Sequence, residues 1–194
     1  MFLIYLIMFS TSTFAKQYYN IARDAKEMNY MDKSCFRVNL PYPEVCIDKK
    51  NKCYAALLLD NYASCVSEYT AIAQYVYAHL VTCNECIQDV FLGIAQVEMC
   101  HLALLGDVIV DLGVRPKFVS GCGETWCSSF VPYGCSTEER LKLAINSEYQ
   151  AILQYQKHIV KIKNCSIEAL LERIILDEKL HVKIFKELLC EYQQ

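Results

Sequence analysis

Two short motifs in the sequence have the residue types and the spacing to bind metal ions. Each is Glu-x-x-His, and each follows a further glutamate by thirty residues. A Glu and a His three positions apart project from one face of a helix. Together the motifs and the preceding glutamates offer four carboxylates and two imidazoles, from Glu68, Glu98, His101, Glu148, Glu178 and His181. Such an oxygen-rich set with two nitrogens and no thiolate suits Fe(II) or Mn(II).

The glutamates that precede the motifs belong to a repeated octapeptide. EYTAIAQY at residues 68–75 returns as EYQAILQY at residues 148–155, with two differences. In both copies Ala, Ile and Tyr follow the glutamate at offsets of three, four and seven, so the carboxylate shares its helical stripe with apolar residues. Buried carboxylates repel one another or take up protons, and no Lys or Arg lies on these stripes. We therefore expect two divalent cations among them.

The first two helical patterns predict one antiparallel pair. Apolar residues recur at helical spacing from about Cys53 to Val81. Thr82-Cys83-Asn84-Glu85 then matches a capping box, which predicts a second helix from there to about Leu112. Because the connection is short, the two helices must be neighbours that run in opposite directions.

A second pair follows after a long connection. Ser136-Thr137-Glu138-Glu139 predicts a capped third helix to about Ile162, and Ser166 can cap a fourth that runs almost to the C-terminus. Residues 114–135 contain Pro and Gly and no sustained period, so they form a loop long enough to cross a bundle. The predicted fold class is all-α: residues 51–194 form a four-helix bundle with one long crossover loop, after an apolar N-terminus and irregular arm over residues 1–50.

At this point the chain resembles the ferritin-like di-metal carboxylate proteins, which take a Glu from each of two helices and Glu-x-x-His from each of the other two. The resemblance covers about residues 53–192 and is clearest over residues 91–102 and 170–189. Within that group the chain looks most like the rubrerythrin family, and more distantly like the manganese catalases. A ferritin-like bundle is the fold that this resemblance implies.

The resemblance also implies a role for each donor. One glutamate and one histidine of each half would hold one ion, Glu68 with His101 and Glu148 with His181. The remaining glutamates, Glu98 and Glu178, would bridge the two ions, and we predict them as the catalytic residues.

The activity implied is that of a di-metal oxidoreductase, with rubrerythrin-like reduction of hydrogen peroxide, or of O2, at two iron ions; manganese is the second choice. Two departures bear on this. The additional glutamate that rubrerythrins have one turn after the third-helix ligand is Ala151 here, and only one Cys-x-x-Cys knuckle is present, Cys83-Asn84-Glu85-Cys86. We therefore expect an external electron donor such as a rubredoxin. We also expect a homo-oligomer.

Two alternatives stay open. The first is disproportionation of peroxide, as in manganese catalases, which needs no electron donor. The second is a structural bundle, such as a spore-coat component, in which metal ions only hold the helices together. The knuckle is either a redox-active dithiol or an ordinary pair of thiols, and Cys122, Cys127 and Cys135 could clip the crossover loop.

Composition excludes some classes of function. The formal charge is −3 and the lysines are scattered, which disfavours a nucleic-acid surface or a basic membrane anchor. The apolar segment at residues 1–15 is too short to span a bilayer. It is a signal peptide, an apolar tail, or a stretch upstream of the true start. We expect the protein in the cytoplasm with its twelve cysteines reduced.

Spacing sorts the remaining residues near the motifs. His79 lies too far along the axis from Glu68, and His158 points about 80° away from Glu148, so neither can join the donors. Tyr75 and Tyr155 either donate hydrogen bonds near the metals or pack in the core. Cys65 is predicted to be a core residue.

Overall fold

The computed structural model describes residues 35–193, which lie in one compact unit. Within this range the chain forms α-helices and one short 3-10 helix, and its only β feature is an isolated bridge between Val119 and Thr125. The predicted all-α class is therefore confirmed. The apolar N-terminus and the first part of the predicted arm lie outside the described residues.

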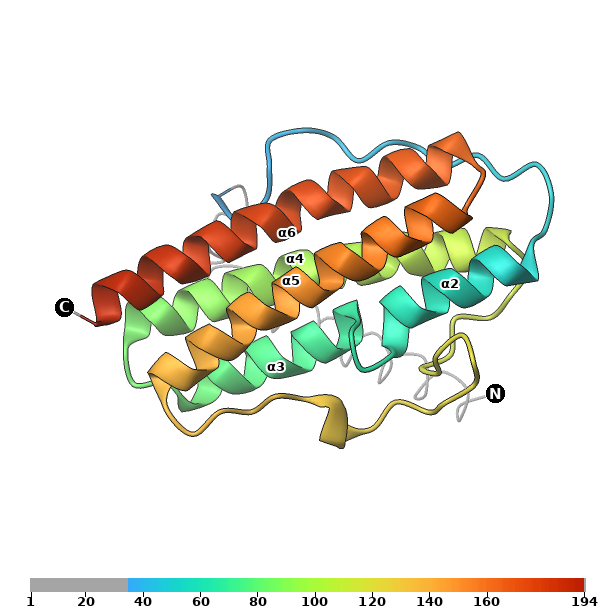
Figure 1. Ribbon diagram of the computed structural model, residues 1–194. Helices are drawn as coiled ribbons and strands as arrows, with labels where there is room; N and C mark the ends of the chain where they lie inside the picture. Colours follow the sequence, from blue (N-terminus) through green and yellow to red (C-terminus); the bar gives the residue numbers. More distant parts are fainter. Residues whose placement is uncertain (1–34, 194) are drawn as a thin grey trace, which may run out of the picture. The chain divides into compact units, whose positions relative to one another are not determined.

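The helices form a four-sided bundle. Helices α2 (Lys52–Ala63) and α3 (Glu68–Val81) lie end to end along one side, and α4 (Glu85–Asp111), α5 (Thr137–Lys161) and α6 (Cys165–Tyr192) form the others (Figure 1). The most extensive packing is of α3 on α4 and of α5 on α6, which matches the two predicted pairs. The crossover from α4 to α5 includes the 3-10 helix η2 (Ser128–Phe130).

The main apolar core holds the helices together. It joins side chains of α2, α4, α5 and α6, among them the fully buried Leu58, Leu105, Ile109, Leu171 and Ile174. Each such side chain contributes about 1.5–3 kcal/mol relative to an exposed one. The core therefore offsets the cost of burying polar groups in the same bundle.

The first predicted helix is interrupted, so the prediction of one helix from Cys53 to Val81 was wrong. The Ser64 hydroxyl accepts a hydrogen bond from the Val66 amide, and the Ser67 hydroxyl caps α3 by accepting from the Thr70 amide, each at 3.2 Å. Serine and threonine side chains that bond to nearby backbone compete with a helix in this way. As a result, α3 begins at Glu68, and the break lies beside that carboxylate.

Two of the predicted helix caps are corrected as well. Thr82 ends α3, and the side chain that caps α4 belongs to Asn84, which accepts from the Ile87 amide. Helix α6 is capped by Asn164, two residues before the predicted Ser166. Asparagine is among the best capping residues, and in both places it lies at the point where the backbone first turns helical. The predicted cap at Ser136 is confirmed.

The crossover loop lies along the outside of α2 and α3. The ring of Phe118 packs on Tyr62 and Tyr69, and the Trp126 indole nitrogen donates to the Thr70 hydroxyl at 2.9 Å. A Cβ at Gly121 would lie only 2.2 Å from the Ala56 carbonyl oxygen, so this close approach requires glycine. The loop is thus fixed to the helix that begins with Glu68.

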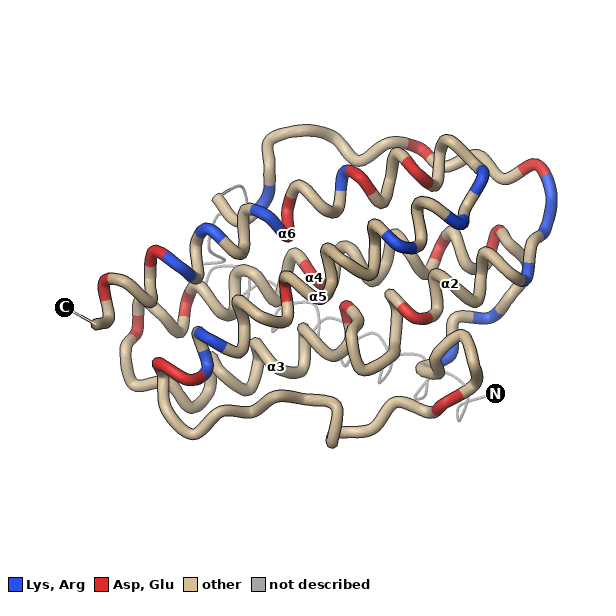
Figure 2. The backbone as a smooth tube through the Cα atoms, viewed as in Figure 1, with Lys and Arg blue, Asp and Glu red and all other residues tan. Residues whose placement is uncertain are grey.

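Charges are mixed over the bundle. Figure 2 shows Lys and Arg interspersed with acidic residues, with no basic stripe along a helix. Of the described helices, α4 alone is long and apolar enough to cross a membrane by length and composition, and 56% of its most apolar window is buried inside the bundle. The same helix contains Glu98 and His101, which face the bundle interior.

Candidate metal centre

The six predicted donor side chains meet in the middle of the bundle. Each is buried, with at most 3% of its surface exposed. Helix α3 begins with Glu68, α4 contributes Glu98 and His101, α5 contributes Glu148, and α6 contributes Glu178 and His181. Residues from two distant parts of the chain therefore share one interior site.

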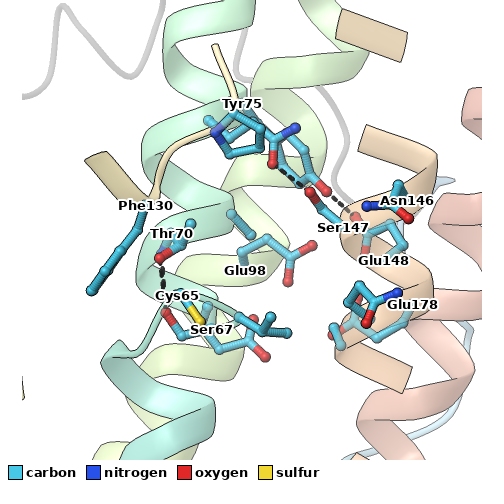
Figure 3. Close-up of a pocket in the computed structure, with 17 residues that line it drawn as sticks. Cys65, Ser67, Thr70, Tyr75, Glu98, Phe130, Asn146, Ser147, Glu148 and Glu178 are labelled. Carbon is cyan, nitrogen blue, oxygen red and sulfur yellow. Dashed lines mark hydrogen bonds between the residues drawn. The ribbon is translucent and has the colours of Figure 1, made fainter. Parts of the chain in front are cut away.

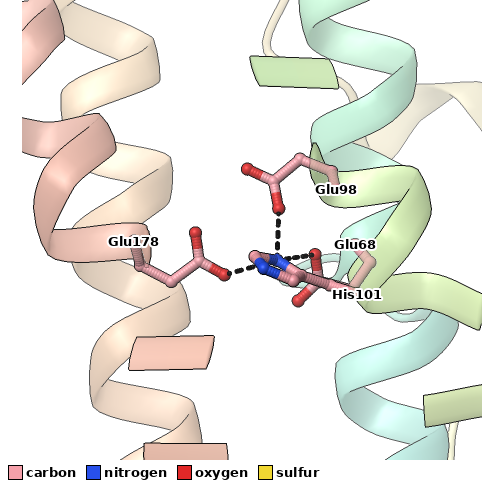
Figure 4. Close-up of side chains that lie close together, drawn as sticks. All are labelled: Glu68, Glu98, His101 and Glu178. Carbon is pink, nitrogen blue, oxygen red and sulfur yellow. Dashed lines mark hydrogen bonds and ion pairs between the residues drawn. The ribbon is translucent and has the colours of Figure 1, made fainter. Parts of the chain in front are cut away.

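The first cluster surrounds His101. Its Nδ1 atom lies 3.0 Å from Glu98 Oε2, 3.3 Å from Glu178 Oε1 and 3.5 Å from Glu68 Oε2. Figure 4 shows the three carboxylates converging on the ring from both sides of the bundle. One potential ligand atom from each of the four residues lies within 4.8 Å of the others.

The second cluster repeats this geometry around His181. Its Nδ1 atom lies 3.0 Å from both Glu178 Oε2 and Glu98 Oε1, and 3.6 Å from Glu148 Oε1. Glu98 and Glu178 thus belong to both clusters, with one oxygen directed at each histidine. This is the arrangement expected of carboxylates that lie between two ions.

The donor atoms fit a pair of cations. Two atoms bound to one ion at about 2.0–2.2 Å and at right angles are about 3 Å apart, as these nitrogens and oxygens are. In addition, Glu68 Oε2, Glu98 Oε1 and Glu178 Oε1 are buried, and each lies 3.0–3.5 Å from a histidine nitrogen. Two imidazoles cannot satisfy four buried carboxylates, so this cluster suits two metal ions, and its chemistry suits iron or manganese.

Protons occupy the centre when metal ions do not. Burial raises the pKa of Glu68 and Glu148 well above the ordinary value, and the charges of Glu98 and Glu178 raise it further. Burial alone would also raise the pKa of Glu98, but contacts with His181 and His101 outweigh it and lower that pKa. Metal ions must therefore displace protons from Glu68 and Glu148, here called the lone glutamates because neither belongs to a Glu-x-x-His motif.

In the metal-free centre the two histidines are also protonated. Burial acts to lower the pKa of His101 and of His181, but the surrounding carboxylates outweigh burial and raise both values well above the ordinary one. Each Nδ1 atom faces the carboxylates, so the metal-free centre uses these nitrogens as donors. Loss of those protons leaves two nitrogen ligands directed at the cluster.

Two tyrosines link the first half of the bundle, α2 to α4, with the second half, α5 and α6. The Tyr75 hydroxyl on α3 donates to Glu148 Oε1 at 2.5 Å, and the Tyr155 hydroxyl on α5 donates to Glu68 Oε1. Burial, followed by the charge of the paired glutamate, raises the pKa of both phenols. Both open interpretations hold: each hydroxyl bonds to a donor glutamate, and each ring packs in the core, Tyr75 against Phe91 and Phe185.

Sequence reasoning missed Asp177, which lies immediately before the second motif. Its Oδ2 atom is 3.2 Å from His101 Nε2 and accepts from the Tyr42 hydroxyl at 2.7 Å, and its Oδ1 atom is 2.8 Å from Arg173 Nη1. Burial acts to raise the pKa of Asp177, but these bonds and one from the Val38 amide lower it to about 2. In the sequence, the pattern that could have indicated this role is an acidic residue with Arg173 one turn earlier on a buried helix face.

A pocket of about 170 Å³ reaches the cluster from one side. It passes between α3 and α5 beneath the crossover loop and touches all four carboxylates of the centre; Figure 3 shows Glu98, Glu148 and Glu178 around it, with Phe130 of the loop at its edge. Gln74 lines the same pocket, and its Nε2 atom is buried without a hydrogen-bond partner in the described structure. The centre is therefore open to a very small molecule.

The other predictions near the site have mixed outcomes. His79 and His158 lie outside the centre, where they contact the Gln88 carbonyl and the Asn61 side chain. Cys65 was predicted to be a core residue and is instead exposed; it lies in the break before α3, at the pocket. Cys83 and Cys86 are also exposed, and no disulfide occurs in the described part of the chain.

Comparison with known proteins supports the fold. No family model matches the chain. A wild-type manganese catalase from Anabaena matches with a TM-score of 0.75 and 23% identity over 80% of each chain. A di-iron carboxylate protein from Bacillus anthracis matches with a TM-score of 0.59 and 24% identity over 71% of this chain and 96% of that one. The fold is ferritin-like. This confirms the predicted ferritin-like bundle, and at this identity the structures show the fold alone.

A curated sequence relative agrees with the structures. It is a probable manganese catalase from Clostridium acetobutylicum, 22% identical over an alignment of 167 residues that covers 75% of this chain and 74% of the relative. A specific relationship to rubrerythrins is not shown by these matches and stays a prediction.

Proposed function

We propose that the protein is a di-metal oxidoreductase that disproportionates hydrogen peroxide at a centre built from the six clustered residues. The observation on which this depends most is the pocket, because it connects all four buried carboxylates with the outside. A purely structural metal pin needs no such opening. The manganese catalases among the similar proteins support manganese over the iron expected from the sequence.

The size of the pocket limits the substrate. At about 170 Å³ it is well below the roughly 300–1,000 Å³ of pockets that take drug-sized ligands. It is lined by small and polar side chains such as Ser67, Gln74 and Ser147. Hydrogen peroxide fits these dimensions, whereas a bulky organic hydroperoxide does not.

The residues of the chain divide the work. Two adjacent manganese or iron ions, when bound, supply the two-electron redox change that cleaves an O–O bond. Glu98 and Glu178 keep the two positions close together, and the tyrosine bonds orient Glu68 and Glu148. In the metal-free centre the raised pKa values of Tyr75 and Tyr155 keep both phenols protonated, so each donates a hydrogen bond to its glutamate.

The reaction balances without an external electron donor. One peroxide accepts two electrons and two protons to give two waters, and a second releases both to give O2. Rubrerythrin-like reduction, which the sequence alone favoured, would need an electron donor such as a rubredoxin. The similarity to a di-iron carboxylate protein supports this as the alternative function.

Oxygen evolution tests the proposal. The purified protein is loaded with Mn(II) or Fe(II) and given hydrogen peroxide with and without a reductant. We expect the manganese form to release one O2 for every two peroxides without a reductant. Consumption only in the presence of a reductant would support the rubrerythrin-like alternative, and no consumption with both metals bound would support a structural role.

A further inference from the structure

One segment ahead of the helices contacts both histidines of the proposed centre. The Phe36 carbonyl oxygen accepts a hydrogen bond from His181 Nε2 at 2.9 Å. The Tyr42 hydroxyl lies 3.2 Å from His101 Nε2. These are the nitrogens that face away from the four glutamates of the centre, so residues 36–42, here called the arm clamp, hold the outer edge of both rings, together with Asp177 at His101.

The arm clamp is fixed to α6 by charged groups rather than by loose contact. Arg173 donates to the Val38 carbonyl at 2.6 Å and to the Leu40 carbonyl at 2.9 and 3.0 Å. Its guanidinium also lies 4.5 Å from the centre of the Tyr42 ring. The Val38 amide donates to Asp177 Oδ1 at 2.7 Å. Hydrogen bonds to buried charges are among the stronger ones in proteins, so the clamp has a defined position.

A missing side chain on α4 makes room for the clamp. The ring of Phe36 is buried, and a Cβ placed on Gly93 would lie 2.4 Å from it. Any residue larger than glycine at position 93 would therefore displace Phe36 and, with it, the carbonyl that accepts from His181. The clamp is seated on both helices that bear a Glu-x-x-His motif.

We propose that Phe36 and Tyr42 are positioning residues for the two histidines, and that docking of the arm clamp and occupancy of the metal centre stabilise each other. A hydrogen bond at Nε2 selects the tautomer whose Nδ1 is free to bind an ion and fixes the plane of the ring. Coupling of this kind is reciprocal, so bound metal must also stabilise the docked clamp. This inference rests on the proposed metal centre.

Hydrogen exchange in the wild-type protein tests the reciprocal half directly. Amides of residues 36–42 are compared in the metal-free and the manganese-loaded protein, with the crossover loop as an internal reference. We expect at least about 5-fold slower exchange in the clamp of the loaded protein, the lower end of typical coupling between two sites. Equal clamp exchange in both forms, with two ions bound, would overturn the coupling while leaving the metal centre intact.

Metal release tests the positioning half. Tyr42→Phe keeps the ring and removes only the hydroxyl, so we expect release to a chelator to become biphasic, with one ion leaving about 10–100-fold faster. The control Tyr133→Phe changes an exposed tyrosine of the crossover loop and should release both ions as wild type does. Uniform, unchanged release from Tyr42→Phe would overturn the role of Tyr42. A wild-type protein that binds no metal would overturn the centre and the clamp together.

Discussion

The two halves of the bundle present the same donors but differ in what supports them. Around both histidines the Nδ1-to-carboxylate distances agree to within about 0.3 Å from one half to the other. The helix before Glu68 is broken, however, whereas α5 runs unbroken through Glu148. The pocket between α3 and α5 is therefore bordered by a helix start on one side and by a continuous helix on the other.

The outer edges of the histidines differ as well. Asp177 precedes the second motif, whereas the equivalent residue of the first is Val97. The Asp177 carboxylate contacts His101 Nε2, whereas His181 Nε2 contacts the Phe36 backbone carbonyl. The donor atoms thus have the same geometry in both halves, whereas the contacts that hold the outer edge of each histidine differ.

The largest effect should come from the glutamates that both clusters share. We expect Glu98→Ala and Glu178→Ala each to lower peroxide turnover by about 100-fold or more, beyond the 10–100-fold typical of residues that only support a ligand. Turnover and metal content are measured together, with the exposed Glu172→Ala as the control. Full turnover with both ions bound in either variant would refute a shared role.

The metal-free form of Glu178→Ala should lose stability as well. Glu178 lies 3.3 Å from His101 Nδ1 and 3.0 Å from His181 Nδ1, so apo Glu178→Ala leaves these protonated rings with one carboxylate fewer and should melt below the apo wild type. The loaded wild type also gains stability from bound metal that the variant lacks. An apo variant that melts no lower than the apo wild type would show that repulsion among the carboxylates outweighs their contacts with the histidines.

The next largest effect should distinguish Asp177 from its counterpart. Asp177→Ala leaves the buried guanidinium of Arg173 without its carboxylate partner, and we expect a loss of about 3 kcal/mol in the free energy of unfolding. Val97→Ala removes only buried apolar surface and should cost about 1–2 kcal/mol. Urea unfolding of the metal-free variants measures both; equal losses would mean that the halves are anchored alike.

A smaller and symmetrical effect is expected from the tyrosines. Tyr75→Phe and Tyr155→Phe each remove one hydroxyl that bonds to a glutamate of the other half. We expect each to cost about 1 kcal/mol of apo stability, with the two values within about 0.5 kcal/mol of each other. A clear inequality would show that the break before α3 also weakens the bond to Glu68.

The smallest expected effect is on pH dependence. In the metal-free protein the lone glutamates and both histidines have raised pKa values, so above about pH 5 the folded chain binds more protons than the unfolded chain. Stability then falls as pH rises. The lowered pKa values of Glu98 and Asp177 matter only below about pH 4, where the unfolded groups take up protons.

Thermal melts at pH 6 and pH 8 measure this dependence. The metal-free protein should melt at a lower temperature at pH 8, whereas the loaded protein should not, because metal ions replace the protons. Greater stability of the metal-free protein at pH 8 would contradict the conclusion that the lone glutamates and the two histidines are protonated in the metal-free centre.

Much of the fold follows from periodicity in the sequence. The helical spacing around Glu68 and Glu148, and the duplicated offset of thirty residues, were enough to predict the bundle and the six residues that meet. The break at residues 64–67 was not predictable in this way, because the apolar pattern continues through it and the competing hydrogen bonds come from two serines and Thr70.

The support around the donors was harder to predict. Tyr42 lies between two prolines in a segment without a period, and its partner Asp177 is 135 residues away. Phe36 acts through its backbone carbonyl, which leaves no trace in the side-chain pattern. Contacts of this kind depend on where the arm lies in three dimensions, so only the structure reveals them.

The central claim is that two metal ions lie between the halves, and anomalous diffraction from manganese-loaded crystals tests it most directly. The account predicts two peaks about 3.5–4 Å apart, as in other two-metal sites, one beside His101 Nδ1 and one beside His181 Nδ1. A single peak, or manganese bound only outside the six clustered residues, would contradict it.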